Sequence, residues 1–307
     1  MWRTSSDGES AAVVGVVVPA FGPGPELVKG VEAALAQASL VVVVVDEDPV
    51  STGSDLVLDR CAELGAAVVR HDANRGIGAA LNTGVEHLRA HLAGLTHVLT
   101  LDQDSAIPEH YVDALLDHDR AAEARGVSVG MVAPGEVASI VRIRRPRSGA
   151  RHAEDVVVGG EPIQSGLLIP LGVLERVGAF DQALFIDGVD TDFYLRARDA
   201  GLQCVLASGI ELEHRLGQAI TGPGDRELPL LVASTFRYYY QWRNLVTLLR
   251  RHTSRHPMWA VRAVGRAARH LLIVTVLAPG RGARLREAAA GLRAGLRHEE
   301  GRRPDHG

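Results

Sequence analysis

Two carboxylates stand close together at the end of an apolar run in THVLTLDQDSAIPEHY, which begins at Thr96. Asp102 and Asp104 flank one glutamine directly after Leu101. Residues i and i+2 of an extended chain point to the same side, and two carboxylates held there repel each other unless a cation lies between them. Mg2+ prefers such oxygen ligands and often bridges a carboxylate to a phosphate. The pair is therefore a candidate metal site, and a simple turn is the alternative, because Asp, Ser and Pro are common turn formers.

Polar residues that follow two other apolar runs are candidates for the same site. Asp46 ends the run LVVVVVD, where a carboxylate can accept hydrogen bonds from a base or a ribose. The stretch NRGIGAALNTGV places Asn74, Gly76 and Asn82 around a strand-to-helix turn, where glycine permits close approach and a helix N-terminus favours anions. A solvated strand end and a tightly packed turn are the alternative explanations. The turn lacks a P-loop lysine and the G-x-G-x-x-G spacing, which disfavours an NTPase or a dinucleotide enzyme.

A third group of acids lies in FIDGVDTDFYLRARDAG, where Asp187, Asp190 and Asp192 precede Arg196. Carboxylates near a helix N-terminus interact well with the helix dipole, but capping explains only one of the three. One of them is therefore a candidate general base. His214, in ELEHRLG, follows a short strand-like stretch, where a single histidine is usually structural.

The elements that must position these residues alternate between strand and helix patterns in the first half of the chain. Strands are predicted at residues 12–19, 40–46, 66–71 and 96–102, with a helix after each of the first three. This alternation predicts an α/β fold, a mostly parallel central sheet flanked by helices. Ligands of such sheets lie outside the carboxyl ends of the strands. Asp46 and Asp102 should therefore face one crevice.

The second half of the chain has a different pattern. Strands are predicted at residues 127–135, 137–145, 163–170 and 202–207, a loop at 145–160, a helix at 189–201 and long helices from about 229 to 297. We expect a catalytic domain at 1–225 and a basic helical extension at 226–307. The first ten residues contain no apolar signal region, and Cys61 and Cys204 form no C-x-x-C motif. These features predict a cytoplasmic protein without a disulfide framework or a zinc site.

The order of these motifs resembles the family 2 glycosyltransferases of the GT-A fold. It runs from Asp46 through NRGIGAALNTG, LDQDS, SGLLIP and FIDGVDTDFYLR to HRLG. The form LDQDS, with RYYYQWRN downstream, is most similar to bacterial rhamnosyltransferases, and the resemblance covers about residues 12 to 250.

The resemblance implies a role for each candidate residue. Asp190 would be the catalytic base, with Asp187 as its rival. Asp104, Asp102 and His214 would hold Mg2+ or Mn2+. The nucleotide sugar would contact Asp46, Asn74, Gly76, Asn82, Asp102 and Gln103.

The resemblance also implies an activity, the inverting transfer of a sugar to a glycan or a polyprenyl-diphosphate-linked acceptor in cell-envelope polysaccharide synthesis. The preferred donor is dTDP-L-rhamnose, and UDP-galactofuranose is the alternative. Base identity stays open, because Pro19-Ala20-Phe21 and DEDP replace residues that the family often carries on the nucleotide side. A sugar-phosphate nucleotidyltransferase is a second alternative, although Lys29 lies too deep in its helix to bind a triphosphate. A non-enzymatic nucleotide-binding module would leave the acids at 187–192 unexplained.

Charge is divided unevenly along the chain. From Arg237 onward the chain contains 15 arginines and four carboxylates, a net charge of +11. Because the whole chain has a net charge of −4, the first 236 residues have a net charge of −15. The apolar run from Leu271 to Pro279 is about half of the roughly 20 residues that span a bilayer. The sets Arg262, Arg266, Arg269 and Arg286, Arg293, Arg297 recur at helical spacing.

These features predict helices that lie on the cytoplasmic membrane face, and packing on the domain is the alternative. We expect a chain without residues 251–307 to stay soluble and to lose this membrane contact. No nucleic-acid partner is expected.

Overall fold

The structure is a computed structural model. It describes residues 11–48, 55–138, 143–144, 147–152, 156–214, 218–221 and 227–304. His214 is described by its backbone alone.

A twisted sheet forms the centre of the molecule, and its first half is parallel. The strands of that half are β1 Val14–Ala20, β2 Leu40–Val45, β3 Ala67–Arg70 and β4 His97–Thr100. They lie in the order β3-β2-β1-β4, and every pairing among them is parallel. Val41 to Val45 are almost completely buried, as expected of a parallel strand covered on both faces.

The second half of the sheet is mixed. Its strands are β5 Ser105–Ala106, β6 Val129–Ala138, β7 Ile143–Arg144, β8 Arg147–His152, β9 Val156–Gly159, β10 Leu167–Pro170 and β11 Gln203–His214. The main path continues from β4 as β10-β6-β11-β9-β8. β6 and β11 are parallel, and β10 is antiparallel to both of its neighbours. The α/β prediction is confirmed, and the parallel pairing is concentrated in the first half.

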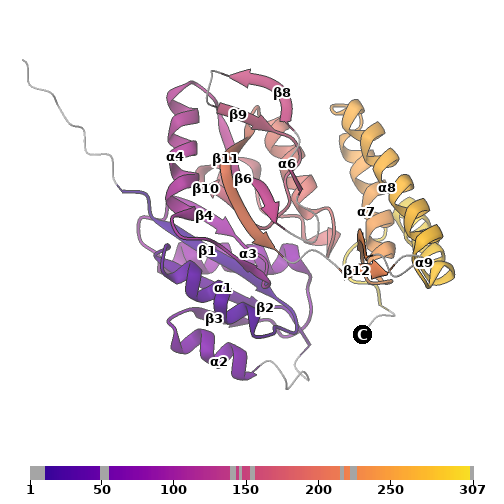
Figure 1. The fold of residues 1–307 in the computed structure, drawn as a ribbon, viewed down its shortest axis with the longest axis horizontal. Coiled ribbons are helices and arrows are strands. Elements are labelled where there is room, and N and C mark those ends of the chain that lie inside the picture. Colours follow the sequence, from indigo (N-terminus) through magenta and orange to yellow (C-terminus); the bar gives the residue numbers. More distant parts are fainter. Residues whose placement is uncertain are drawn as a thin grey trace, which may run out of the picture.

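Helices cover both faces of the sheet (Figure 1). They are α1 Glu26–Leu35, α2 Asp55–Glu63, α3 Ile77–His91, α4 Tyr111–Ala124, α5 Leu171–Val177, the 3-10 helix η1 Gln182–Leu184 and α6 Val189–Asp199. Alternate residues of β1 enter two separate cores, because successive side chains of a strand point to opposite faces. Val16 packs with α1, α2 and α4, whereas Val17 packs with α3, α5 and α6.

The C-terminal part begins with a β-hairpin. β12 Gln218–Thr221 pairs with β13 Glu227–Val232, and α7 Arg237–His252, α8 Pro257–Leu277 and α9 Arg281–Leu296 follow. Two sequence predictions are therefore wrong. Part of the predicted loop at 145–160 forms β8 and β9, and the residues around Pro229 form a strand, so the helices begin at Arg237. The predicted domain boundary at 225 lies between two paired strands and stays a prediction.

Helices α7 and α9 approach each other closely, and Figure 1 shows α7, α8 and α9 grouped beside the sheet domain. A Cβ atom added at Gly291 would lie 2.0 Å from the backbone oxygen of Tyr239, and one at Gly295 would lie 2.8 Å from that of Arg243. Removing residues 251–307 would take this partner from α7 and expose its buried tyrosines. The predicted solubility of that shortened chain therefore does not follow from the structure.

None of the helices in the described part of the chain combines the length and hydropathy needed to cross a membrane.

Candidate active site

The two carboxylates after β4 lie in a turn that is bonded to Ser165, a residue of the segment before β10. The backbone N–H of Asp102 donates to Ser165 Oγ at 3.0 Å, and Ser165 Oγ lies 2.8 Å from Ser105 Oγ. Ser105 N–H donates to the carbonyl of Asp102. The sequence therefore forms a turn and also presents two half-buried carboxylates at the end of a parallel strand.

His214 reaches the same place through the sheet. β5 pairs with the end of β11, and His214 lies opposite Ser105, the residue after Asp104. The backbone of His214 therefore lies beside that of Ser105, one residue after the predicted ligand Asp104. No group of three metal-ligating side chains is present among the residues whose side chains are described, so the complete metal site stays a prediction.

Asp190 lies half-buried in the first turn of α6. The pKa of its carboxyl group is raised to about 7, first by burial and then by the negative charges of Glu161, Asp187 and Asp102, against a hydrogen bond from the Thr191 backbone. A carboxyl group with this pKa exchanges a proton near neutral pH, which is the property of a general base.

Asp187 has a different environment from Asp190. Arg237, at the start of α7, donates from Nε to Asp187 Oδ2 at 3.0 Å and from Nη2 to Oδ1 at 2.6 Å. Asp187 also has a φ of +66°, a conformation that few residues other than glycine adopt. Both oxygens of Asp187 are thus bound in a two-point ion pair, the geometry of a strong charge-assisted contact, whereas Asp190 lies among negative charges.

Two adjacent residues of α7 hold the segment that leads to these acids. The Asn244 side-chain amide donates to the carbonyls of Leu184, Ile186 and Asp187 at 2.7 to 2.9 Å. Arg243 donates to the carbonyl of Leu184 at 2.8 Å. Both side chains are 1% exposed. Helix α7 thus determines where the chain enters α6.

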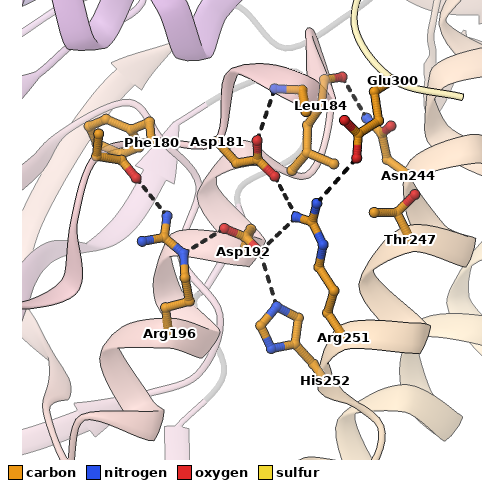
Figure 2. Close-up of polar contacts among 12 residues, drawn as sticks. Phe180, Asp181, Leu184, Asp192, Arg196, Asn244, Thr247, Arg251, His252 and Glu300 are labelled. Atoms are coloured by element: carbon orange, nitrogen blue, oxygen red, sulfur yellow. Dashed lines mark hydrogen bonds and ion pairs between the residues drawn. The ribbon is translucent and has the colours of Figure 1, made fainter. Parts of the chain in front are cut away.

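Asp192, the third acid of the cluster, belongs to a structural network. Figure 2 shows its contacts with Arg196, His252 and Arg251. Burial opposes ionisation of this carboxyl group, but the bonds from His252 and Arg196 lower its pKa. Figure 2 also shows Arg251 between Asp181 and Glu300. Asp192 therefore joins α6 to α7, and its contacts are not those of a catalytic group.

Asp46 organises the glycine turn that follows β3. Its Oδ1 accepts from the backbone N–H of Arg75 and contacts His71, and its Oδ2 accepts from Gly76, all at 2.7 Å. Asn74 Oδ1 also accepts from Gly76. Gly76 has a φ of +91°, and an added Cβ would lie 2.4 Å from the carbonyl oxygen of Phe185. The turn therefore packs directly against the segment before Asp187.

Asn82 and Gln103 have partners inside the protein. Asn82 is buried and exchanges two hydrogen bonds with the backbone of Phe180, each 2.9 Å long. Gln103 exchanges two with the backbone of Phe21, at 2.7 and 3.1 Å. The bonds of Asn82 join α3 to the segment that leads to Asp187. The bonds of Gln103 join the loop after β1 to the turn that contains Asp102 and Asp104. The nucleotide contacts predicted for Asn82 and Gln103 stay predictions, and their described roles are structural.

Three residues of this site carried no assignment from sequence. Arg237 and Asn244 lie in the stretch RYYYQWRN, which contributed only to a resemblance, and Glu161 lies in a segment without a recognisable motif. Each acts on a residue at least 30 positions away in the chain. Only the folded arrangement identifies them.

Known proteins resemble this chain in sequence and in fold. Residues 15–155 match the family described as glycosyl transferase family 2. A dTDP-rhamnosyl transferase of Shigella flexneri, RfbF, is 29% identical over 188 residues, which are 58% of this chain and 61% of that protein. The matched region is thus less than two thirds of the relative's length.

A solved structure of GalNAc-T7, crystallised with UDP, GalNAc and Mn2+, aligns with a TM-score of 0.52 at 12% identity and covers 81% of this chain and 55% of that one. At this identity the alignment shows a shared fold.

Proposed function

We propose that this chain, whose residues 15–155 match the family described as glycosyl transferase family 2, is an inverting hexosyltransferase of that family that moves a sugar from a nucleotide donor to a hydroxyl group. The observation that carries the proposal is the contrast between its two rival acids. Asp190 lies among negative charges with its pKa raised to about 7, whereas Asp187 is paired with Arg237. A single base poised near neutral pH is what one displacement by an alcohol requires.

The proposed reaction is one displacement at the anomeric carbon. Asp190 accepts the proton of the acceptor hydroxyl while that oxygen bonds to the anomeric carbon and the bond to the diphosphate oxygen breaks. Attack from the face opposite the leaving group inverts the carbon, by the logic of inverting glycosidases. Arg237 binds both oxygens of Asp187, so Asp190 is the acid of the two that is left to accept the proton.

The carboxylates after β4 are the type of ligand that a hard divalent cation prefers. Asp102 and Asp104 offer oxygen ligands, and the side chains that act electrostatically on Asp190 include Glu161, Asp187 and Asp102, all negative. Asp104 and Asp102, completed by His214, would hold Mg2+ or Mn2+, which when bound supplies positive charge for the leaving diphosphate. The Mn2+ of GalNAc-T7 is consistent with this proposal.

The donor we propose is dTDP-L-rhamnose, and the similarity to dTDP-rhamnosyl transferase RfbF supports it. UDP-galactofuranose is the second candidate. A screen of nucleotide sugars, scored by release of the nucleoside diphosphate, tests both. We expect turnover and a thermal shift with dTDP compounds. A shift with UDP and none with dTDP would reverse the choice.

The acceptor we propose is a glycan or a polyprenyl-diphosphate-linked sugar at the cytoplasmic membrane face. The outer face of α8 supports this choice. Met258, Val261, Leu272 and Val276 recur along it and are 63 to 70% exposed. Helix α8 contains three arginines and no carboxylate, and all three are exposed.

We therefore name this exposed side of α8 the apolar face and propose that it rests on an anionic lipid surface. A helix in that position lies flat in the headgroup region.

A further inference from the structure

Glu161 connects two helices that are distant in the sequence. Its Oε1 accepts a hydrogen bond from Thr191 Oγ1 in the first turn of α6, at 2.5 Å. Its Oε2 accepts from Arg266 Nη2 in α8, also at 2.5 Å. Both oxygens of the carboxylate are thus in use, and the side chain is only 20% exposed.

Thr191 is the residue that orients Asp190. Its backbone N–H donates to Asp190 Oδ1 at 2.8 Å. The residue before this helix, Gly188, provides no side-chain cap, so the first turn lacks the restraint that Ser, Thr, Asp or Asn usually supplies there. The bond from Thr191 to Glu161 is a tie from outside the helix that restrains this turn.

We propose that Glu161 is a positioning residue for Asp190, which it places by holding Thr191, and that Arg266 of α8 holds Glu161 in turn. The proposal rests on the assignment of Asp190 as the base. It adds a physical link between the helix with the apolar face and the catalytic carboxylate. Glu161 also contributes the largest charge effect on Asp190, after burial, and this effect raises the pKa.

The sharpest test uses Thr191, because valine has the shape of threonine without its hydroxyl group. Thr191→Val should lower kcat about tenfold, the scale of one charge-assisted hydrogen bond, with KM for the donor unchanged. Thr191→Ser retains the hydroxyl and should keep most of the activity. Equal activities of the two variants would overturn the proposal.

Variants of Glu161 distinguish its hydrogen bond with Thr191 from its charge effect on Asp190. Glu161→Gln retains an oxygen acceptor for Thr191 but removes the negative charge and the acceptor for Arg266, so kcat should fall severalfold, as in Arg266→Gln, while the acidic limb of the pH profile moves to lower pH. Glu161→Ala also removes the acceptor for Thr191, so kcat should fall about tenfold with the same shift of the limb. The other charges that act on Asp190, those of Asp187 and Asp102, are unchanged in both variants. An unmoved limb in Glu161→Gln would contradict the proposal.

Arg266→Gln tests the outer half of the link. It should lower kcat severalfold without a change in donor KM, whereas Arg60→Gln, which breaks an exposed ion pair with Glu63 on α2, should have no effect. Wild-type kcat in Arg266→Gln would remove α8 from the proposal. Asp190→Asn, measured beside these variants, separates the two proposals. Full activity of Asp190→Asn would refute the base assignment, whereas loss of activity there with normal Thr191→Val and Glu161→Ala would refute only the positioning role.

Discussion

Arg237 binds both carboxylate oxygens of Asp187, at 2.6 and 3.0 Å. The two residues are 50 positions apart in the chain, and the contact brings the start of α7 to the start of α6. The pair neutralises one of two acids that the sequence left as rivals. It therefore makes Asp190 the better candidate for the base, and it ties the C-terminal helices to the site.

Asp190→Asn should lower kcat about 100-fold or more, the scale of general base catalysis, with donor binding little changed. Asparagine has the same shape and cannot accept the proton. Asp187→Asn should lose less of kcat and should unfold at a lower temperature, because Arg237 then lacks its ion-pair partner. Steady-state kinetics and thermal unfolding of both variants are the measurements. An active Asp190→Asn beside an inactive Asp187→Asn would exchange the two roles.

Activity should depend on pH through Asp190. Its base form is the carboxylate, and its pKa is raised to about 7, so kcat/KM should be constant above that pH and fall about tenfold per unit below it. Initial rates of donor turnover, measured between pH 5 and 9 at constant ionic strength, give the profile. A flat profile down to pH 5 would be incompatible with Asp190 as the base.

Asp104→Asn should abolish metal-stimulated turnover while the thermal stability stays close to that of the unchanged protein. An amide oxygen is a weaker ligand for Mg2+ than a carboxylate, and the half-buried side chain lies in a turn outside the core. Turnover is measured against added Mg2+ and Mn2+ and after treatment with EDTA. Full activity of the unchanged protein in EDTA would refute the metal requirement.

The apolar face of α8 should bind anionic vesicles. Val261→Asp and Leu272→Asp each place a charge on it and should weaken vesicle binding about tenfold at low salt, through lost apolar burial and added repulsion. Leu56→Asp is the matched control, since Leu56 is 84% exposed on α2. Point variants replace the truncation because α9 packs on α7. If the unchanged protein does not sediment with such vesicles, the lipid contact is wrong.

The approach of α9 to α7 should depend on Gly291. Gly291→Ala brings a Cβ atom to 2.0 Å from the Tyr239 carbonyl oxygen, so we expect a loss of about 2 kcal/mol in the free energy of unfolding. Gly265→Ala on α8 meets nothing within 4 Å and should be neutral or stabilising by about 0.5–1 kcal/mol. Chemical denaturation of both variants measures the difference.

The first half of the fold could be predicted from the sequence because its signals are local. Runs of valine form strands, the intervening segments have helical periodicity, and carboxylates such as Asp102 appear where a strand ends. The segments at 147–152, 156–159 and 227–232 were mispredicted because their signals are not local. Their strand identity comes from pairing with β9, β11 and β12, and such pairing is not visible in a short window.

The sequence by itself determined the α/β architecture, the acids that compete to be the base, the paired carboxylates at a strand end and the basic character of the C-terminal helices. Only the tertiary structure decided which acid is neutralised, because an ion pair depends on distance in space and Arg237 lies 50 residues from Asp187. For the same reason it assigned Asn82 and Gln103 to structural contacts and brought Glu161 to Thr191. Residue type and spacing indicate which chemistry a side chain can perform. Its contacts with remote segments determine whether that side chain is free to react or is held in a structural interaction.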